Sequence, residues 1–181
     1  LPGSRRSEIS HCLPTMLEAA RAVAKNKYQI IVAAAPGIDD SFYQTYLENE
    51  ILTRNPYATL AQAKAAVVNS GTATLETALI GCPQTAVYHV AGSKYLEKFL
   101  RPIMFSIPNF TLVNIISKQE IIQELIASRF TQENVTNELQ RLLHDNAYRE
   151  QMQTNYLHLW NILGNNSASE TAAEQIITTV N

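Results

Sequence analysis

The residues best suited to binding a ligand form a run of small side chains followed by one carboxylate, Ser70-Gly71-Thr72-Ala73 and then Glu76. The run separates a short apolar segment from a stretch with helical character. Backbone N–H groups in the first turn of a helix lack partners and the helix dipole adds positive charge, so small side chains let a phosphate approach closely. Glu76 lies about one and a half turns beyond Gly71, where its carboxylate could accept hydrogen bonds from a ribose diol. The pattern therefore predicts a nucleotide site.

The same residues also fit an ordinary junction between a strand and a helix. In that interpretation Ser70 or Thr72 only caps the helix. A turn with a single glycine is a weak motif by itself. Spacing alone leaves both interpretations open.

Three other polar residues could reach this site. Arg5 ends the small-residue loop Gly3-Ser4-Arg5, and its guanidinium can hold a phosphate or a leaving diphosphate in bidentate geometry. A surface arginine at a helix start is the alternative. Asn114 follows an apolar run that we expect to be extended, and its amide can contact a ligand or cap the next element. His89 is the one histidine expected at the end of a strand.

Two glutamates and two cysteines are the remaining residues whose side chains could take part in catalysis or metal binding. Glu120 and Glu124 are four residues apart and are expected to share a helix face, either as a carboxylate pair or as a solvated face. Neither the acidic residues nor Cys12 and Cys82 have the spacing of metal ligands, so we expect no metal site. Reduced thiols in a cytosolic protein are the simplest expectation.

The composition is that of an ordinary globular chain with enough apolar residues to form a hydrophobic core. It has 181 residues, 46% of them hydrophobic and 17% charged, with a formal net charge of −2. This balance gives no reason to expect nucleic acid as a partner. No apolar run approaches the roughly 20 residues needed to span a bilayer, and residues 1–20 lack the features of a signal peptide. The opening has neither a methionine nor a lead-in strand, which predicts a piece of a longer protein.

The elements that must position these residues alternate between strand and helix. We expect strands at 28–35, 50–53, 67–69 and 85–90, and helices at 7–25, 39–49, 59–65 and 72–79. Such alternation indicates βαβ units and a parallel sheet, with ligands beyond the carboxyl ends of the strands. From about Gln119 onward only helices are expected, at 120–128, 131–144, 147–163 and 167–180.

Two amphipathic stretches have open roles. Residues 92–101 are expected to form a basic amphipathic helix that packs on the domain or meets a membrane surface or an anionic substrate. An aromatic stripe near the end could pack on this domain or on a missing partner; it consists of Tyr148, Tyr156, Leu159, Trp160 and Leu163.

Three motifs together resemble one known family. Leu1–Arg5, Ser70–Glu76 and Leu112–Ile116 are similar, in order and spacing, to segments of the lipid A disaccharide synthases, which are bacterial GT-B glycosyltransferases. The similarity covers essentially the whole chain and corresponds to the C-terminal half of the family. It implies an α/β fold, with a Rossmann-like parallel sheet, helices on both faces and a helical C-terminal tail. Residues 1–118 would form the UDP-sugar-binding core and 119–181 the helical part, with the N-terminal acceptor domain absent.

The resemblance also implies a reaction. A diacylated glucosamine would pass from UDP to a diacylated glucosamine 1-phosphate with inversion, without a metal or another cofactor. Arg5 would stabilise the leaving diphosphate, and the general base would lie in the missing domain, so this chain alone should bind UDP and transfer nothing. The residues implied in UDP binding are Gly3, Ser4, Arg5, Ser70, Gly71, Thr72, Ala73, Glu76, Asn114 and Glu124.

The implied partners are UDP-diacylglucosamine and, through the missing domain, a lipid acceptor. A cytoplasmic location follows from the same resemblance, with peripheral contact to the inner face of the cytoplasmic membrane as an option. A homodimer through the C-terminal helices is a further option.

The sequence departs from the family pattern at two places. Val113 stands where many members have proline, and Ser117-Lys118 replace a small pair, so the loop shape after Asn114 is open. Two other GT-B enzymes are rivals. The UDP-GlcNAc 2-epimerase has a second glycine where this chain has Thr72, and the peptidoglycan GlcNAc transferase has Arg-Ala-Gly in place of Asn69–Gly71. A non-catalytic nucleotide-binding module is the third alternative.

Overall fold

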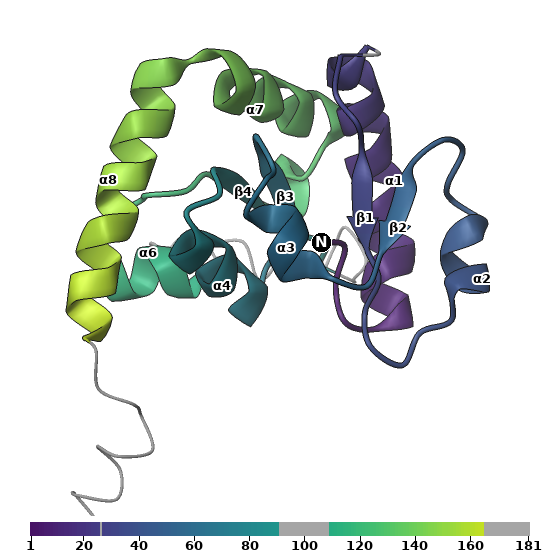
Figure 1. The fold of residues 1–181 in the computed structure, drawn as a ribbon, viewed down its shortest axis with the longest axis horizontal. Helices are drawn as coiled ribbons and strands as arrows, with labels where there is room; N and C mark the ends of the chain where they lie inside the picture. Colours follow the sequence, from purple (N-terminus) through teal and green to yellow (C-terminus); the bar gives the residue numbers. More distant parts are fainter. Residues whose placement is uncertain (26, 91–108, 165–181) are drawn as a thin grey trace, which may run out of the picture.

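The computed structural model describes residues 1–25, 27–90 and 109–164 of the chain (Figure 1). The helices in this part are α1 (Arg6–Ala24), α2 (Asp40–Gln44), α3 (Pro56–Leu60), α4 (Thr72–Ile80), α6 (Leu112–Ser117), α7 (Gln132–His144) and α8 (Asn146–Leu163). The strands are β1 (Ile31–Ala33), β2 (Ile51–Thr53), β3 (Ala66–Asn69), β4 (Gln84–Tyr88) and β5 (Glu124–Ile126), and a 3₁₀ turn covers Ala127–Arg129. The helices expected at 92–101 and 167–180 lie outside the described residues.

All described strand pairs are parallel, as the alternation of strands and helices predicts. β1 pairs with β2, and β4 lies between β3 and β5 in a second sheet. The second sheet is the centre of the fold, because Thr85, Ala86 and Val87 of β4 are fully buried. Both faces of β3 and β4 are covered, which explains why these strands show no alternating apolar and polar pattern; the polar Gln84 and Thr85 of β4 are buried too.

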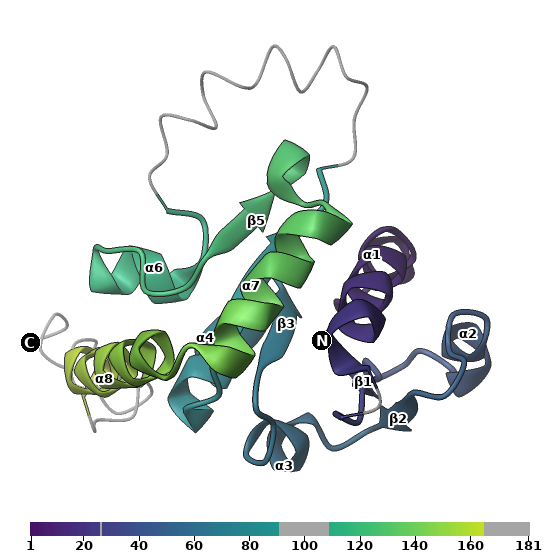
Figure 2. The same cartoon turned by 90° about the horizontal axis from the view of Figure 1, so that it is seen from above.

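Helices cover both faces of the β3–β4–β5 sheet, as the resemblance implies. Val87 points to one face and packs with Met16 of α1 and Val135 of α7. Its neighbour Ala86 points to the other face, into a cluster with Ala78 of α4 and residues of α6 and α8. This alternation is the two-residue period of a strand. Figures 1 and 2 show α1 and α7 side by side on one face, with α4 on the other. The predicted fold class is confirmed.

The expectation of helices only after Gln119 is wrong, because β5 lies at Glu124–Ile126 and pairs with β4. The segment 120–128 has apolar residues four apart, a spacing that suits a helix, yet its buried residues enter the sheet. A strand this short, buried on both faces, carries no period of its own. Consequently Glu120 and Glu124 do not share a helix face.

The other boundaries differ by a few residues. The run before Asn114 is not extended, since α6 begins at Leu112 and Thr111 caps it by accepting a hydrogen bond from the Asn114 amide at 3.3 Å. The helix expected at 59–65 ends at Leu60 and starts earlier, with Pro56 in its first turn and Asn55 as cap. The strand at 28–35 and the helix at 39–49 are also shorter, at Ile31–Ala33 and Asp40–Gln44.

The aromatic stripe packs largely on its own domain. Tyr156 and Leu159 of α8 are buried against α4 and α6, and Tyr148 lies beside them. The Trp160 indole donates a hydrogen bond to the Leu79 carbonyl at 3.1 Å. A dimer through these helices stays a prediction. Within the described residues, no helix has the length and apolar character needed to cross a bilayer.

Candidate functional site

The structure brings together two motifs that are far apart in the sequence. The Asn69 amide donates to the Leu1 carbonyl at 2.8 Å. Gly3 packs so tightly that a Cβ atom there would lie 2.8 Å from Asn69 Nδ2 and 2.9 Å from Glu8 Cβ, and its φ is +126°. Only glycine tolerates both constraints. We call the segments Gly3–Arg5 and Asn69–Glu76 the surface loops, although the second includes the start of α4. They meet where α1 and α4 begin.

A carboxylate that the motif analysis did not single out organises the first surface loop. Glu8 accepts hydrogen bonds from the Ser4 amide (3.0 Å) and the Arg5 amide (3.3 Å), and it pairs with the Arg5 guanidinium at 2.6 Å. Partial burial by itself raises the pKa of Glu8, but these hydrogen bonds outweigh it and hold the pKa below its ordinary value. The Arg5 side chain is 75% exposed. Glu8 therefore holds the Arg5 backbone amide and one nitrogen of its guanidinium, while the side chain as a whole stays exposed. An acidic residue in a first helical turn was the available signal.

The second surface loop is the small-residue turn. β3 ends at Asn69, the Ser70 amide donates to the Val87 carbonyl at 2.7 Å, and α4 begins at Thr72. The cap residue is Gly71, and no side chain caps the helix start. The interpretation of Ser70 or Thr72 as an ordinary cap is thus not what the structure has. Gly71 and Thr72 are exposed, with open space above Gly71, so an anion can approach the first turn.

Glu76 lies on the exposed side of α4 and has a partner that sequence reasoning missed. The Tyr57 hydroxyl of α3 donates to the Glu76 carboxylate at 3.0 Å. This hydrogen bond raises the pKa of the Tyr57 phenol, whose residue is 56% exposed. No local pattern could have linked the two residues, because only the fold places α3 against α4.

Asn114 and Glu124 are placed differently, in what we call the buried network. The Asn114 residue is fully buried, and its amide donates to the Glu124 carboxylate at 2.8 Å and accepts from the backbone amides of Ile121 (2.8 Å) and Ile122 (3.1 Å). Glu124 also accepts from the amide (2.9 Å) and hydroxyl (2.8 Å) of Thr111. These bonds tie the start of α6 to β5. Both residues lie beyond β4 from the surface loops, and their direct contact with a ligand stays a prediction.

His89 directly follows β4, at the strand end where the sequence predicts it. Its ring stacks on His11 of α1, with centroids 4.7 Å apart and planes 16° from parallel. Among the described residues, no three His, Cys, Asp or Glu side chains come close enough to hold a metal ion. Cys12 and Cys82 are buried free thiols.

A parallel sheet covered on both faces, with a small-residue turn and a basic loop at the carboxyl end of its strands, defines a Rossmann-like α/β domain of the kind found in GT-B glycosyltransferases. A family model described as lipid-A-disaccharide synthetase matches residues 1–177, and the chain belongs to this family.

Relatives named lipid-A-disaccharide synthase align over nearly the whole chain. The protein of Syntrophus aciditrophicus is 34% identical over 192 residues, covering 99% of this chain and 48% of the relative. That of Koribacter versatilis is 33% identical, covering 98% and 48%, and that of Myxococcus xanthus is 31% identical, covering 98% and 47%. The chain thus spans about half the length of these relatives.

Proposed function

We propose that this chain is the donor-binding half of an inverting glycosyltransferase that joins two diacylated glucosamines into the lipid A disaccharide. The donor is UDP-diacylglucosamine and the acceptor a diacylated glucosamine 1-phosphate. The observation that carries the proposal is the contact between the two surface loops, with Gly3 fitted against Asn69. Together with membership of the synthetase family, this contact favours one continuous site for a nucleoside diphosphate.

The diphosphate would lie over the first turn of α4. The Thr72 and Ala73 amides at the helix start favour negative charge, and Gly71 leaves room for close approach. Arg5 would reach the same oxygens from the opposite side. When the acceptor hydroxyl attacks the anomeric carbon, the bond to the phosphate oxygen breaks and the electron pair moves onto UDP. Fixed donors at that place stabilise the leaving group without a metal.

The nucleoside would extend along α4 from the diphosphate. The Glu76 carboxylate would accept hydrogen bonds from the ribose hydroxyls. Tyr57 holds Glu76 in position through its hydroxyl and leaves an exposed ring beside it. Ser4 and Ser70 would also contact the donor. Asn114 and Glu124 would act on the site by fixing the start of α6.

The rest of the reaction would belong to the other half of the enzyme. The proton of the acceptor hydroxyl needs a general base, which we expect to lie outside this chain. The lipid acceptor would bind there too. The chain by itself should bind UDP and form no disaccharide.

Calorimetry with UDP tests the donor site. We expect binding to the chain in EDTA that is unchanged when magnesium is added, because Arg5 and the α4 amides replace the metal. Binding that requires magnesium would contradict the proposed chemistry. Mixing the chain with both sugar substrates should yield no disaccharide, and measurable turnover would mean that the general base lies in this chain.

The ribose assignment needs a comparison of two ligands. Glu76→Gln should weaken UDP binding several-fold, while inorganic diphosphate, which has no ribose, should bind as before. Glu120→Gln removes the same charge outside the site and serves as the matched control. Equal losses for UDP and diphosphate would remove the ribose role of Glu76.

A further inference from the structure

Asn69 lies at the point where the two surface loops meet, and the proposed function gives its side chain no role. It is the last residue of β3 and directly precedes the small-residue turn. In the parallel ladder it lies opposite Val87, which packs against α1 and α7. Residues that are paired in this way point to the same face of a sheet, so the Asn69 side chain points toward α1.

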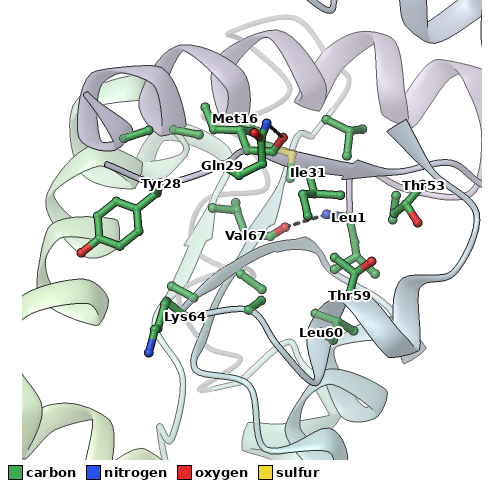
Figure 3. Close-up of a pocket in the computed structure, with 18 of the residues that line it drawn as sticks. Leu1, Met16, Tyr28, Gln29, Ile31, Thr53, Thr59, Leu60, Lys64 and Val67 are labelled. Atoms are coloured by element: carbon green, nitrogen blue, oxygen red, sulfur yellow. Dashed lines mark hydrogen bonds between the residues drawn. The ribbon is translucent and has the colours of Figure 1, made fainter. Parts of the chain in front are cut away.

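The backbone next to Asn69 is bonded to Leu1. The Asn69 backbone amide donates to the Leu1 carbonyl at 2.8 Å, and the Val67 carbonyl accepts from the Leu1 nitrogen at 2.9 Å. Figure 3 shows the second of these bonds. Because Leu1 and Pro2 lead directly to Gly3, the two bonds hold the first surface loop against the end of β3.

A buried thiol fixes the orientation of the Asn69 side-chain amide. Cys12 Sγ donates to Asn69 Oδ1 at 3.5 Å, and Cys12 is 1% exposed. Burial raises the pKa of this thiol, so it keeps its proton at neutral pH and acts as the donor of the pair. The oxygen of the Asn69 amide therefore faces Cys12, and its nitrogen faces away from Cys12.

The nitrogen of this amide faces the first surface loop without an acceptor. A Cβ atom at Gly3 would lie 2.8 Å from Asn69 Nδ2, and Nδ2 makes no hydrogen bond to any residue that the structure describes. The Asn69 residue is only 5% exposed. Nearly all buried side-chain donors in proteins are paired, because an unpaired one is costly. A ligand that supplies an acceptor here would remove this cost.

The groups around this nitrogen indicate what kind of ligand fits. Arg5 in the same surface loop is a cation with a 75% exposed side chain, and the first turn of α4 has no side-chain cap. The neighbouring carboxylate of Glu8 is already used by the Ser4 and Arg5 amides. The remaining groups are all donors, and a phosphate has enough oxygens and charge to accept from all of them at once.

We propose that Asn69 is a further residue of the donor site, whose side-chain amide donates a hydrogen bond to the phosphate that carries the sugar. This inference rests on the proposed function. With the ribose at Glu76, the phosphate next to the ribose lies over the start of α4. The second phosphate then lies on the far side of the turn, toward Asn69 and Gly3.

This position gives the Asn69 amide a part in the reaction. When the acceptor oxygen bonds to the anomeric carbon, the bond from that carbon to an oxygen of the second phosphate breaks. The electron pair stays on the phosphate oxygen, and UDP leaves with the added negative charge. A donor that is already fixed at this place, by Cys12 on one side and Gly3 on the other, stabilises the charge without having to reorganise.

Calorimetry with UDP and UMP tests the assignment, because UMP lacks the second phosphate. Asn69→Leu keeps nearly the same shape but has no donor, so UDP binding should weaken roughly tenfold while UMP binding stays within about twofold. Asn69→Asp places an oxygen where the nitrogen lies, and it should weaken UDP binding further by repulsion. Asn137→Leu and Asn137→Asp, at an exposed position of α7, are the matched controls and should bind both ligands as the wild type does.

Thermal unfolding without ligand separates this role from a structural one. An amide that supports the fold lowers Tm when it is removed, whereas removal of an unpaired buried donor does not. We therefore expect ligand-free Asn69→Leu to keep its Tm within about 2 °C of the wild type or to exceed it. The rise in Tm that saturating UDP gives should be smaller in this variant. A lower Tm together with equal losses for UDP and UMP would overturn the proposal.

A measurement on the wild type does not depend on how the variants fold. In a proton–nitrogen correlation spectrum, the side-chain signals of Asn69 are identified by their absence from Asn69→Leu, or by selective asparagine labelling. They should shift when UDP binds and hardly move with UMP. Signals that move equally with both ligands, or with neither, would overturn the assignment.

Failure of the proposed function would give a different result. A wild-type chain that binds neither UDP nor UMP would overturn the donor site and the role of Asn69 together. A wild type that binds UDP, beside folded Asn69→Leu and Asn69→Asp variants that bind it equally well, would overturn the role of Asn69 alone.

Discussion

The surface loops and the buried network hold the same kinds of group and use them in opposite ways. In the surface loops Arg5 is 75% exposed and paired through its guanidinium with Glu8, and only one oxygen of Glu76 accepts the hydrogen bond from Tyr57. In the buried network Asn114 is fully buried and both ends of its amide are bonded to protein. A polar side chain with its bonds satisfied inside the protein holds the backbone, whereas one with spare donors at the surface can hold a ligand.

Residues of the same family motifs thus differ in role: some hold the backbone in place, and others are free to bind a ligand. Glu124 connects the start of α6 with β5 from inside the protein. Arg5 and the α4 amides face the solvent that a donor would displace. Changes in the buried network should therefore alter stability first, and changes in the surface loops should alter UDP binding first.

Asn114→Ala should have the largest effect. It leaves the Ile121 and Ile122 amides and part of the Glu124 carboxylate without their partner, which costs about 3 kcal/mol in the free energy of unfolding and lowers Tm by roughly 10 °C. Urea denaturation and calorimetry measure both. Asn137→Ala, at an exposed position of α7, is the control and should stay within about 0.5 kcal/mol. A stable Asn114→Ala protein that has lost UDP would mean that this amide contacts the donor directly.

Gly3→Ala tests the contact between the surface loops. The new methyl group would lie 2.8 Å from Asn69 Nδ2 at a φ of +126°, so we expect a loss of about 2 kcal/mol in stability together with weaker UDP binding. Gly37→Ala is the matched control, because Gly37 also has a positive φ of +78° but nothing lies within 4 Å of its Cβ position. It should lose about 1 kcal/mol and leave UDP binding unchanged. Equal behaviour of the two variants would argue against a functional contact between the loops.

Arg5→Gln should affect UDP binding more than stability, in contrast to Asn114→Ala. Loss of a charge-assisted bond to the diphosphate should weaken UDP binding roughly tenfold or more, while stability changes by less than about 1 kcal/mol, since the Arg5–Glu8 pair is exposed. Arg6→Gln removes the same charge one residue away, from a side chain that pairs with Asp39 at 3.7 Å. UDP titrations of both variants provide the comparison. Similar losses would indicate general electrostatic attraction instead of a specific contact.

Sequence alone predicted most of the framework. The long helices α1, α7 and α8 were predictable from their apolar periodicity and, for α7 and α8, from the capping residues Thr131 and Asp145. The parallel fold followed from alternation. The strand β5 was not predictable, because three buried residues carry no period.

The candidate site, like the fold, has features that the sequence predicts and features that it does not. Its residue types and the place of the turn at the end of β3 were local properties and could be predicted. The environments of Asn114 and Tyr57 could not, since each depends on a partner brought in by the fold: Glu124 from β5 and Glu76 from α4. The role of Glu8 could not be recognised from a capping-box pattern, because the residue at the helix cap is Arg5 and not serine or threonine.

The smallest expected effect concerns Glu8. This residue, which is bonded to the first surface loop, holds the backbone by hydrogen bonds, as the residues of the buried network do. Hydrogen bonds from Ser4 and Arg5 hold its folded-state pKa below the ordinary value of 4.5, so the folded state binds fewer protons than the unfolded state near that pH. Its contribution to stability is therefore present above about pH 4.5 and disappears as the pH falls through the lower, folded-state pKa. The Tm difference between the wild type and Glu8→Gln should be measurable at pH 7 and shrink at pH 3. Glu18→Gln, at an exposed position of the same helix, is the control, and a difference that persists unchanged at pH 3 would show that Glu8 acts through packing and not through its charge.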